Sequence, residues 1–458
     1  MKSPLTDRIY RRLFAAQVIA LAGTGLSTVA LALLAYDLAG GDAGMVLGTA
    51  LALKMVAYVG IAPIVGGFAH ILPRRRLLIA LDVVRAAVVA CLPLVTEIWQ
   101  IYLLIFLLNA CSAGFTPTFQ ATIPDILPDE ARYTRALSLS RLAYDLENLL
   151  SPTLAAAALA VLTYDALFAA NALAFLASAL LVFSVRLPAA GVPERGRGIR
   201  DNLSFGVRAY LNTPRLRGLL ALSLAVASAG AMIIVNTVVY VRDRLGGTES
   251  DTALAFAAAG AGSMVVALLL PRLLDRLPDR TFMVSGGFVL TAGLLLGLNA
   301  PDLLMLLPVW FVLGAGSSLI QTPAGRLLRR SAHEGDRPAL YAAQFALSHA
   351  CWLIAYPLAG WVGGTLGLDA AFPLLAGVAL AATAAALALW PAEKSGALEH
   401  VHDAIEHEHL HVHDEHHHDH RHDGWEKTEP HRHAHRHAPV RHSHPYIIDL
   451  HHPVWPAR

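Results

Sequence analysis

Twelve long apolar stretches constrain this chain more than any other feature of its sequence. A helix needs roughly 20 apolar residues to cross the hydrocarbon core of a bilayer, and each stretch is close to that length. The sequence therefore predicts an all-α membrane protein with twelve transmembrane helices. The stretches fall near residues 13–36, 44–69, 77–95, 99–120, 136–162, 164–186, 217–241, 251–271, 281–299, 302–324, 338–365 and 370–390.

Composition supports the same fold class. The 458 residues are 55% hydrophobic and only 15% charged, which is typical of a polytopic membrane protein. Cys91, Cys111 and Cys351 lie in apolar stretches, so neither a disulfide framework nor a zinc site is predicted. The first stretch lacks a clear cleavage site, so no cleavable signal peptide is expected. No phosphate-binding loop and no catalytic constellation was found, so we predict neither enzyme activity nor a nucleic-acid partner.

The apolar region repeats itself at an offset of 205 residues. Pro152 corresponds to Pro357, and residues 66–75 correspond to residues 271–280. This repeat predicts two pseudo-symmetric six-helix bundles in parallel orientation. The predicted domains are residues 1–186 and 217–391 for the two bundles, 187–216 for a cytoplasmic linker and 392–458 for a tail.

Arginines predict the orientation of the chain in the membrane. They gather in alternate loops, which places those loops in the cytoplasm by the positive-inside rule. Arg242 and Arg244 are the exceptions. Both termini are therefore predicted to be cytoplasmic, in a multi-pass protein of the bacterial plasma membrane that we expect to be a monomer. The arginine-bearing loops fall at residues 74–76, 132–135, 186–217, 272–280 and 326–337.

The last part of the chain is rich in histidine. All of the 22 histidines except His70, His333 and His349 lie between His400 and His452. Many alternate as His-x-His, and residues i and i+2 of an extended chain lie on the same side, so neighbouring imidazoles can bind one ion. The predicted metal ligands are His400, His402, His407, His409, His411, His413, His416, His417, His418, His420, His422, His431, His433, His435 and His437.

The chemistry of this tail favours divalent transition metals. Carboxylates such as Asp403, Glu406 and Glu408 lie between the histidines, and imidazole with carboxylate suits Ni²⁺, Cu²⁺, Co²⁺ or Zn²⁺. The segment contains no cysteine, which argues against Cu(I). Its polar composition cannot bury a core, so we predict a disordered tail.

Charged residues inside the apolar stretches are candidates for a transport path. An ammonium in hydrocarbon costs a few kcal/mol or more, so Lys54 either carries a coupling charge or forms an ion pair that fixes helix packing. Arg141 and Asp145 are four residues apart and are predicted to form a structural pair. Glu147 lies about 200° around the helix from Asp145, so these two carboxylates cannot bind one ion together. Glu147 is an ion or proton site, or it pairs with Lys54 or another helix.

His349 adds a possible metal ligand at similar depth. At the repeat offset it corresponds to Tyr144, one helical turn from the position that matches Glu147. His349 and Glu147 could then act as transient ligands of a transition metal, although His349 could also be a packing residue. Asp82 and Arg85, three residues apart, are predicted to be a gating or structural pair. The candidate path residues are Lys54, Tyr144, Asp145, Glu147 and His349.

Several of these features resemble the major facilitator superfamily. The chain has six plus six spans with a basic turn after the second and the eighth. The phrases LDVVR at 81–85, IPDILP at 123–128 and NTPRLR at 212–217 look like the exporter branch that includes siderophore and macrolide pumps. This likeness covers residues 1–391. With its histidine-rich tail, the whole chain resembles the nickel-resistance permeases of that superfamily.

The resemblance also implies charged residues at the turns that follow the second and eighth spans. The family usually has an acidic residue where His70 stands, and Asp275 keeps that residue type in the second half. Gating or structural charges are therefore expected at His70, Arg74, Asp275 and Arg276.

Three functions follow from the sequence. The first is proton-coupled efflux of a divalent metal, Ni²⁺ or else Co²⁺, which would confer metal resistance; the metal is a substrate, and no tightly bound cofactor is expected. The second is export of an organic molecule, a drug or a siderophore, with a regulatory or incidental tail. The third is a membrane metal store or sensor without transport.

Overall fold

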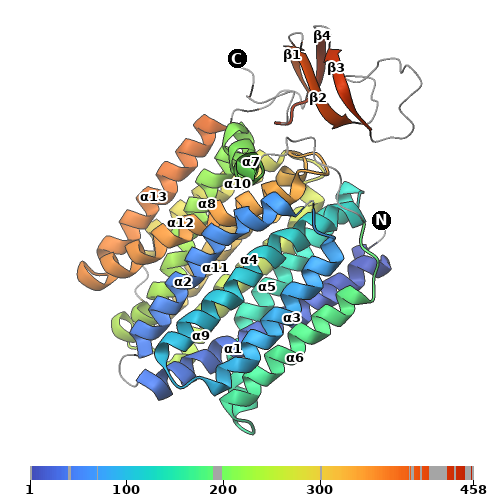
Figure 1. Ribbon diagram of the computed structural model, residues 1–458. Helices are drawn as coiled ribbons and strands as arrows, with labels where there is room; N and C mark the ends of the chain where they lie inside the picture. Colours follow the sequence, from blue (N-terminus) through green and yellow to red (C-terminus); the bar gives the residue numbers. More distant parts are fainter. Residues whose placement is uncertain are drawn as a thin grey trace.

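The computed structural model describes residues 3–39, 43–69, 71–188, 199–299, 302–390, 392, 397–402, 405–411, 431–437, 440–448 and 455. Twelve long helices in these ranges form two six-helix bundles, which confirms the predicted fold (Figure 1). The first bundle contains α1 (Arg8–Ala39), α2 (Ala43–Phe68), α3 (Arg74–Cys91), α4 (Ile98–Ile126), α5 (Glu130–Leu159) and α6 (Tyr164–Phe183). The second contains α8 (Pro214–Val239), α9 (Glu249–Leu273), α10 (Asp279–Gly297), α11 (Leu303–Arg329), α12 (Arg337–Thr365) and α13 (Leu368–Leu389).

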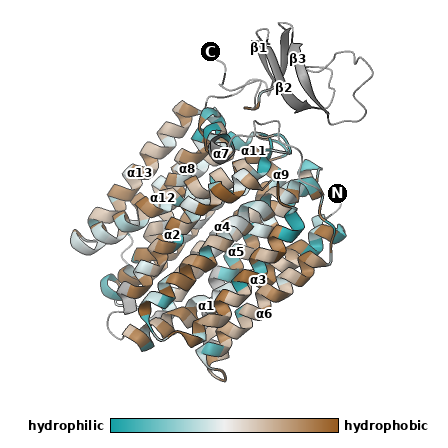
Figure 2. Cartoon of the chain, in the orientation of Figure 1, coloured by the Kyte–Doolittle hydropathy of each residue, from teal (hydrophilic) through white to brown (hydrophobic). Residues whose placement is uncertain are grey.

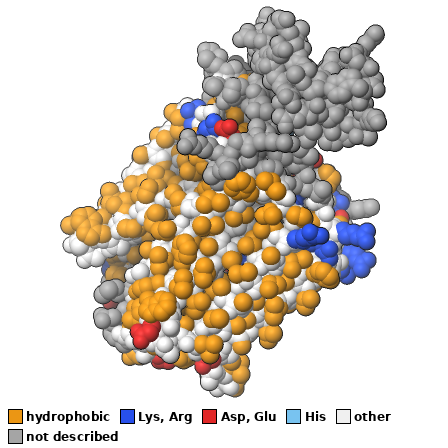
Figure 3. Space-filling view, in the orientation of Figure 1, with side chains coloured by type: hydrophobic (Ala, Val, Ile, Leu, Met, Phe, Trp, Pro, Cys, Tyr) orange, Lys and Arg blue, Asp and Glu red, His pale blue; other side chains and the backbone are white. Residues whose placement is uncertain are grey.

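Within the described ranges, eleven helices are long and apolar enough to cross a membrane. The twelfth long helix is α5, whose acidic and basic residues lower its hydropathy. It packs against α1, α9 and α11, so charged side chains on it can face other helices rather than lipid. Figure 2 shows hydrophobic residues along the helices, and Figure 3 shows apolar side chains over the visible face of the bundle, which is the surface that a bilayer requires.

Small residues let the helices of the second bundle approach closely. A Cβ atom on Gly262 of α9 would lie 1.9 Å from the carbonyl oxygen of Phe311 on α11. A Cβ atom on Gly314 of α11 would lie 1.8 Å from the carbonyl oxygen of Ala259 on α9. Neither glycine can therefore be replaced without separating the two helices, as expected for small residues at packed membrane helices.

The two ends of the bundle differ in charge. Lys and Arg gather at the end where the N-terminal helix begins, and Asp and Glu lie at the other (Figure 3). We call the first the arginine-rich end. The C-terminal strands lie beyond the same end (Figure 1). Arg244 belongs to the opposite end, where it forms an ion pair of 2.5 Å with Asp369 and lies over the Tyr240 ring, so its charge is neutralised locally.

The polar linker between the bundles contains a helix that the sequence analysis did not predict. This helix, α7 (Ile199–Asn212), packs against α2 of the first bundle and α12 of the second. Tyr210 is fully buried, and its hydroxyl donates a hydrogen bond to Gln344 of α12. The linker is therefore part of the packed structure at the arginine-rich end.

The predicted disorder of the tail does not hold for four of its segments, which form strands. β1 (Ala397–His402) pairs with β4 (Val440–Pro445), and β2 (Ile405–His411) pairs with β3 (His431–His437), both antiparallel. The His-x-His alternation has the period of a β-strand, and pairing satisfies the backbone N–H and C=O groups that an extended chain exposes. The other tail residues in the range 403–439 lie outside the described residues.

Candidate transport path and gate between the two halves

The two bundles meet through symmetry-related helices. The second helix of each bundle packs against the fifth helix of the other, as α2 against α12 and α9 against α5. The fourth helices follow the same rule, with α4 against α12 and α11 against α5. Residues on α2, α5, α9 and α12 are therefore placed where relative motion of the halves can expose or bury them.

A cluster of aromatic and basic side chains lies across the α2–α12 contact. The Nζ atom of Lys54 lies 5.6 Å from the ring centre of Tyr58 on α2. The Tyr58 ring meets His349 of α12 edge-on at 4.7 Å and Phe345 at 4.8 Å. The Nδ1 atom of His349 lies 2.6 Å from the carbonyl oxygen of Phe345, which can only accept a hydrogen bond. In neutral His349, Nδ1 therefore carries the proton and Nε2 keeps the lone pair that can bind a metal.

Two residues of α5 belong to the same region. Lys54 interacts electrostatically with Glu147 and with His349. Tyr144 shares a hydrogen bond with Gln17 of α1 and interacts with both Tyr58 and Glu147. The structure thus brings together Lys54, Tyr144, Glu147 and His349 from three helices of the two halves.

Asp145, the fifth candidate, lies elsewhere. Its carboxylate forms the predicted ion pair with Arg141 at 3.0 Å. Arg141 also donates hydrogen bonds to Ser263 of α9 at 2.9 Å and to Gln321 of α11 at 2.7 Å. The pair therefore does more than stabilise its own helix, because it connects α5 of the first half with two helices of the second.

Asp82 and Arg85 form a buried ion pair inside the first half. Ser178 of α6 donates a hydrogen bond to Asp82 at 2.7 Å. The Arg85 guanidinium lies over the rings of Phe115 and Phe175, at 4.1 and 4.5 Å from their centres. The pair joins α3, α4 and α6 and has no described contact with the second half, which fits the structural alternative better than the gating one.

Ion pairs close the arginine-rich end between the halves. Asp125 at the end of α4 binds Arg74 at the start of α3, within the first half, and Arg337 at the start of α12, in the second half. We call these three residues the first triad. Its bond between Asp125 and Arg337 crosses the interface.

A second triad has the same architecture with opposite charges. Arg330 at the end of α11 binds Asp279 at the start of α10 at 3.0 Å, and it also binds Glu130 at the start of α5. At the repeat offset of 205, Arg74 corresponds to Asp279 and Asp125 to Arg330. Each half therefore presents one charge from the end of its fourth helix to the opposite charge at the start of the other half's fifth helix.

Further bonds across the interface reinforce the two triads. Arg326 of α11 binds Glu130 at 2.8 Å and donates a hydrogen bond to Thr134 at 3.2 Å. The buried hydroxyls of Tyr133 on α5 and Tyr341 on α12 lie 2.6 Å apart, and Tyr341 donates to the carbonyl of Gly325 at 3.1 Å. This end of the bundle is thus closed by a layer of polar contacts, which we call the gate.

The remaining predicted gating charges are only partly in the gate. Arg74 is a member of the first triad. Asp275 and Arg276 are exposed on the turn between α9 and α10, and Asp275 lines a cavity that is described below. His70 lies outside the described residues.

We call the four C-terminal strands, residues 397–402, 405–411, 431–437 and 440–445, the histidine arm, and their register shows which histidines lie opposite one another. His407, His409 and His411 of β2 stand opposite His435, His433 and His431 of β3, and His400 of β1 stands opposite His442 of β4. Directly opposed residues of antiparallel strands have Cβ atoms about 4.5–5.5 Å apart. Other predicted ligands, His413, His416, His417, His418, His420 and His422, lie outside the described residues.

The chain after the arm returns to the second bundle. Tyr446 and Ile448 are buried against it, and Tyr446 packs on Trp455 at 5.0 Å. Arg215 of α8 donates a hydrogen bond to the Tyr446 carbonyl at 3.0 Å and lies 5.5 Å from the Trp455 ring centre. The same guanidinium donates to the carbonyl of Arg330, a gate residue, at 2.9 Å. The segment that follows the histidine arm is therefore fastened to the second bundle, close to the gate.

Sequence reasoning missed most of the gate. Arginines at helix ends were used only as signals of membrane orientation, and single carboxylates at helix starts resemble ordinary caps. The repeat offset was a usable signal, because it pairs Arg74 with Asp279 and Asp125 with Arg330. The missed residues are Asp125, Glu130, Tyr133, Asp279, Arg326, Arg330, Arg337 and Tyr341.

No group of three or more His, Cys, Asp or Glu that could hold a metal ion occurs among the residues whose side chains the structure describes. Two symmetry-related bundles, a layer of polar contacts between them at one end, and charged side chains on α2, α5 and α12 where the bundles meet are features of a membrane transporter. The chain belongs to the Major Facilitator Superfamily, whose family model matches residues 13–239 and 220–404.

Related proteins agree with this assignment. The chain is 24% identical over 323 residues to the MFS-type transporter YfiS of Bacillus subtilis (strain 168), covering 68% of this chain and 76% of that protein. It is 26% identical over 152 residues to macrolide efflux protein A of Streptococcus pyogenes, which covers 32% of this chain and only 37% of the relative.

Solved structures share the fold. The human organic anion transporter MFSD10 (TETRAN) superposes with a TM-score of 0.72 at 14% identity, covering 83% of this chain and 99% of that one. A bacterial homologue of the iron transporter ferroportin, in its outward-facing state, superposes with a TM-score of 0.67 at 16% identity, covering 83% and 98%.

Proposed function

We propose that this transporter exports a divalent transition metal, Ni²⁺ or Co²⁺, from the bacterial cytoplasm in exchange for protons and thereby confers metal resistance. The observation that carries the proposal is the attachment of the histidine arm beside the gate, through Arg215 and Arg330. A fastened arm holds its imidazoles close to the mouth of the carrier, which raises the local metal concentration there. The name of a macrolide efflux protein among the related proteins favours efflux.

The arginine-rich end faces the cytoplasm in this proposal, by the positive-inside rule. The gate is closed at that end, so this conformation is the one in which the path does not communicate with the cytoplasm. Separation of α4 from α12 and of α5 from α11 breaks the bond of each triad that crosses the interface, and it admits an ion that the arm has released. The His349 Nε2 atom and the Glu147 carboxylate then supply nitrogen and oxygen ligands, which suit Ni²⁺ and Co²⁺.

Proton coupling follows from competition for one carboxylate. Glu147 cannot hold a proton and coordinate a metal cation with the same oxygen. Lys54 is the cation that interacts with Glu147 in this conformation, and a divalent ion beside Glu147 would repel the Lys54 ammonium. Metal binding from the cytoplasmic side therefore displaces a proton or the Lys54 charge, and protonation from the other side displaces the metal.

Transport into inverted membrane vesicles tests this mechanism. Uptake of Ni²⁺, Co²⁺ and Zn²⁺ is measured with a pH gradient present and with the gradient collapsed. We expect His349→Ala and Glu147→Gln to reduce metal uptake at least tenfold, and collapse of the gradient to abolish accumulation. His333→Ala, which removes an exposed histidine outside the path, is the matched control. The metal proposal fails if wild-type vesicles accumulate none of these ions.

The role of the arm needs a variant that keeps its anchor. Replacing His407, His409, His411 and their three β3 partners with asparagine leaves Tyr446 and Trp455 in place. We expect weaker metal binding by the arm and lower uptake at low metal concentration, with uptake at saturating metal unchanged. Equal uptake at all concentrations would mean that the arm does not deliver metal.

Export of an organic molecule is the second candidate. The aromatic contacts among Tyr58, Phe345 and His349 could hold a ring, and macrolide efflux protein A and an organic anion transporter are among the related proteins. Dye-efflux and metal-uptake assays on the same vesicles separate the two. Dye transport that depends on Tyr58, without metal uptake, would favour the organic substrate.

A further inference from the structure

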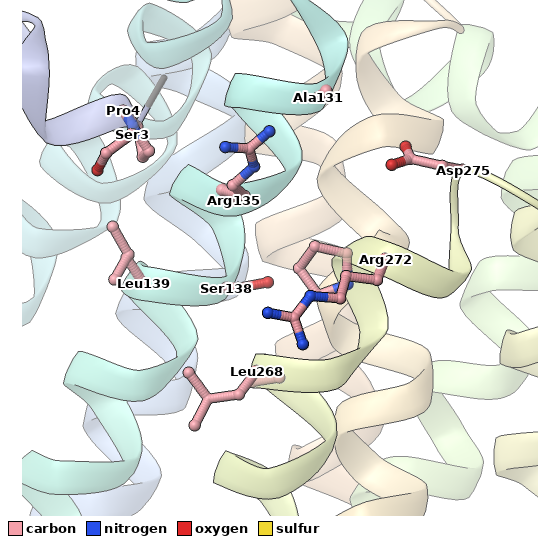
Figure 4. A pocket seen from close by; sticks show the side chains of 11 residues that line it. Ser3, Pro4, Ala131, Arg135, Ser138, Leu139, Leu268, Arg272 and Asp275 are labelled. Atoms are coloured by element: carbon pink, nitrogen blue, oxygen red, sulfur yellow. The ribbon is translucent and has the colours of Figure 1, made fainter. Parts of the chain in front are cut away.

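A cavity of about 460 Å³ opens between α5 of the first half and α9 of the second, at the arginine-rich end. Its size falls within the roughly 300–1,000 Å³ that is usual for small-molecule sites. Figure 4 shows Arg135 on α5 and Arg272 on α9 in the gap between the two helices, with Asp275 on the turn that follows α9. The cavity therefore has one guanidinium from each half of the transporter.

The symmetry-related contact, α2 with α12, has no room for such a cavity at this end. A Cβ atom on Gly66 of α2 would lie 2.3 Å from the Cβ atom of Ala342. The linker helix α7 covers the same region, where a Cβ atom on Gly206 would lie 2.3 Å from the carbonyl oxygen of Ala339. At the repeat offset Gly66 corresponds to Pro271, which lines the cavity. The two symmetry-related contacts therefore differ at this end: α2 and α12 pack tightly, whereas α5 and α9 leave a cavity.

The lining of the cavity is amphipathic. Arg135 and Arg272 are near the helix ends, where Ser138 adds a hydroxyl. Leu139 and Leu268 form an apolar wall one turn further into the bundle, and the Leu268 side chain is 57% exposed. A ligand that fits this lining has an anionic head at the membrane surface and an apolar chain along the helices.

We propose that this cavity binds the phosphate headgroup of an anionic phospholipid, with an acyl chain along Leu139 and Leu268. Guanidinium groups bind phosphate oxygens through paired N–H donors, and basic pockets between membrane helices are a known setting for anionic headgroups. The charged residues of the lining are Arg135, Arg272 and Asp275, which together carry one net positive charge, as suits an anionic headgroup.

A lipid in this position acts on the transport cycle. It contacts Arg135 of the first half and Arg272 of the second, so it bridges the halves on the side where α7 is absent. Its binding therefore favours the conformation in which the gate is closed. This inference concerns the body of the transporter and holds whether the substrate is a metal ion or an organic molecule.

Lipid binding to the purified full-length protein in detergent tests the proposal. Titration with phosphatidylglycerol and phosphatidylcholine, followed by native mass spectrometry, gives the affinity for each. Each surface arginine near an anionic headgroup contributes about fivefold to binding, so Arg135→Gln with Arg272→Gln should weaken phosphatidylglycerol binding about thirtyfold. The matched control is Arg76→Gln with Arg276→Gln, which removes two exposed arginines at the same end but outside the cavity.

A second variant tests the cavity independently, in case the arginine double variant does not fold. Ala131→Phe fills the cavity and keeps both arginines, and it should also remove the preference for phosphatidylglycerol. The proposal is overturned if phosphatidylcholine binds equally well, or if the arginine double variant folds and keeps wild-type affinity. It is also overturned if inorganic phosphate at millimolar concentration competes fully with the lipid, because the site would then recognise free phosphate.

Discussion

The two triads have opposite charges at corresponding positions, so substitutions can test each ion pair of the gate separately. Asp125 and Arg337 have side chains that are 8% and 11% exposed, whereas Glu130 and Arg330 are 40% and 47% exposed. Removing one partner of a buried ion pair costs about 3–5 kcal/mol, whereas exposed pairs contribute about 0–1 kcal/mol. Asp125→Asn should therefore shift the equilibrium toward an open gate by roughly 150-fold to a few thousandfold, and Glu130→Gln by about fivefold or less.

Arg337→Gln should have a smaller effect than Asp125→Asn. In the Arg337 variant, Asp125 keeps its bond to Arg74 within the first half. In the Asp125 variant, the ion pair that Arg337 keeps among the described residues is the distant one with Glu334, at 3.7 Å. The order of effects is thus set by which charge remains without a buried partner.

Exchanging the charges provides the rescue. Asp125→Arg alone places two arginines side by side, together with Arg74, and should open the gate. Combining it with Arg74→Asp and Arg337→Glu turns the first triad into a copy of the second and should restore the closed gate. Spin labels at exposed positions 76 and 276, in a background without the three native cysteines, would report the distance between the halves. Equal effects of Asp125→Asn and Glu130→Gln, or no rescue by the triple exchange, would refute the reasoning.

Three other predictions concern stability and attachment. Asp82→Asn leaves Arg85 buried without its counter-charge and should lower the free energy of unfolding by about 3–5 kcal/mol; unchanged thermal unfolding would contradict this. Arg141→Lys keeps the positive charge but loses the hydrogen bonds to α9 and α11, each of which contributes about 1.5–3 kcal/mol. Transport should therefore fall while membrane insertion stays normal. Wild-type transport would argue against a role of Arg141 in connecting the two halves. Trp455→Ala removes a cation–π contact with Arg215 worth about 0.5–2 kcal/mol, so a protease should release the C-terminal segment faster. An unchanged cleavage rate would show that the anchor does not depend on this contact.

Local sequence patterns were enough to predict the helices and the ion pairs between residues of one helix. Each apolar stretch became one helix, and the spacing of Arg141 and Asp145 predicted their ion pair. The repeat offset placed Glu147 and His349 at similar depth, and the structure places both within electrostatic range of Lys54. Asp145, the fifth candidate, lies apart from them in an ion pair with Arg141, which donates hydrogen bonds to α9 and α11.

The gate and the anchor depend on contacts between distant segments, so they were not predicted. The bond between Asp125 and Arg337 joins residues separated by more than two hundred positions. Before the halves are docked, each of these side chains resembles a solvated charge at a helix end. Tyr446 and Trp455 follow a polar segment, and nothing local in the sequence indicates that both residues contact Arg215.

Residue patterns alone show that the chain spans a membrane in two repeated halves and carries a histidine-rich segment. The membrane spans arise from transfer of apolar residues out of water and from the hydrogen bonding of each helix to itself, both of which are local. The folded protein adds which charges meet across the halves, where the segment after the arm is fastened and which side has a cavity. Those properties depend on how two preformed bundles dock, and the same helices docked with a small rotation would pair different residues.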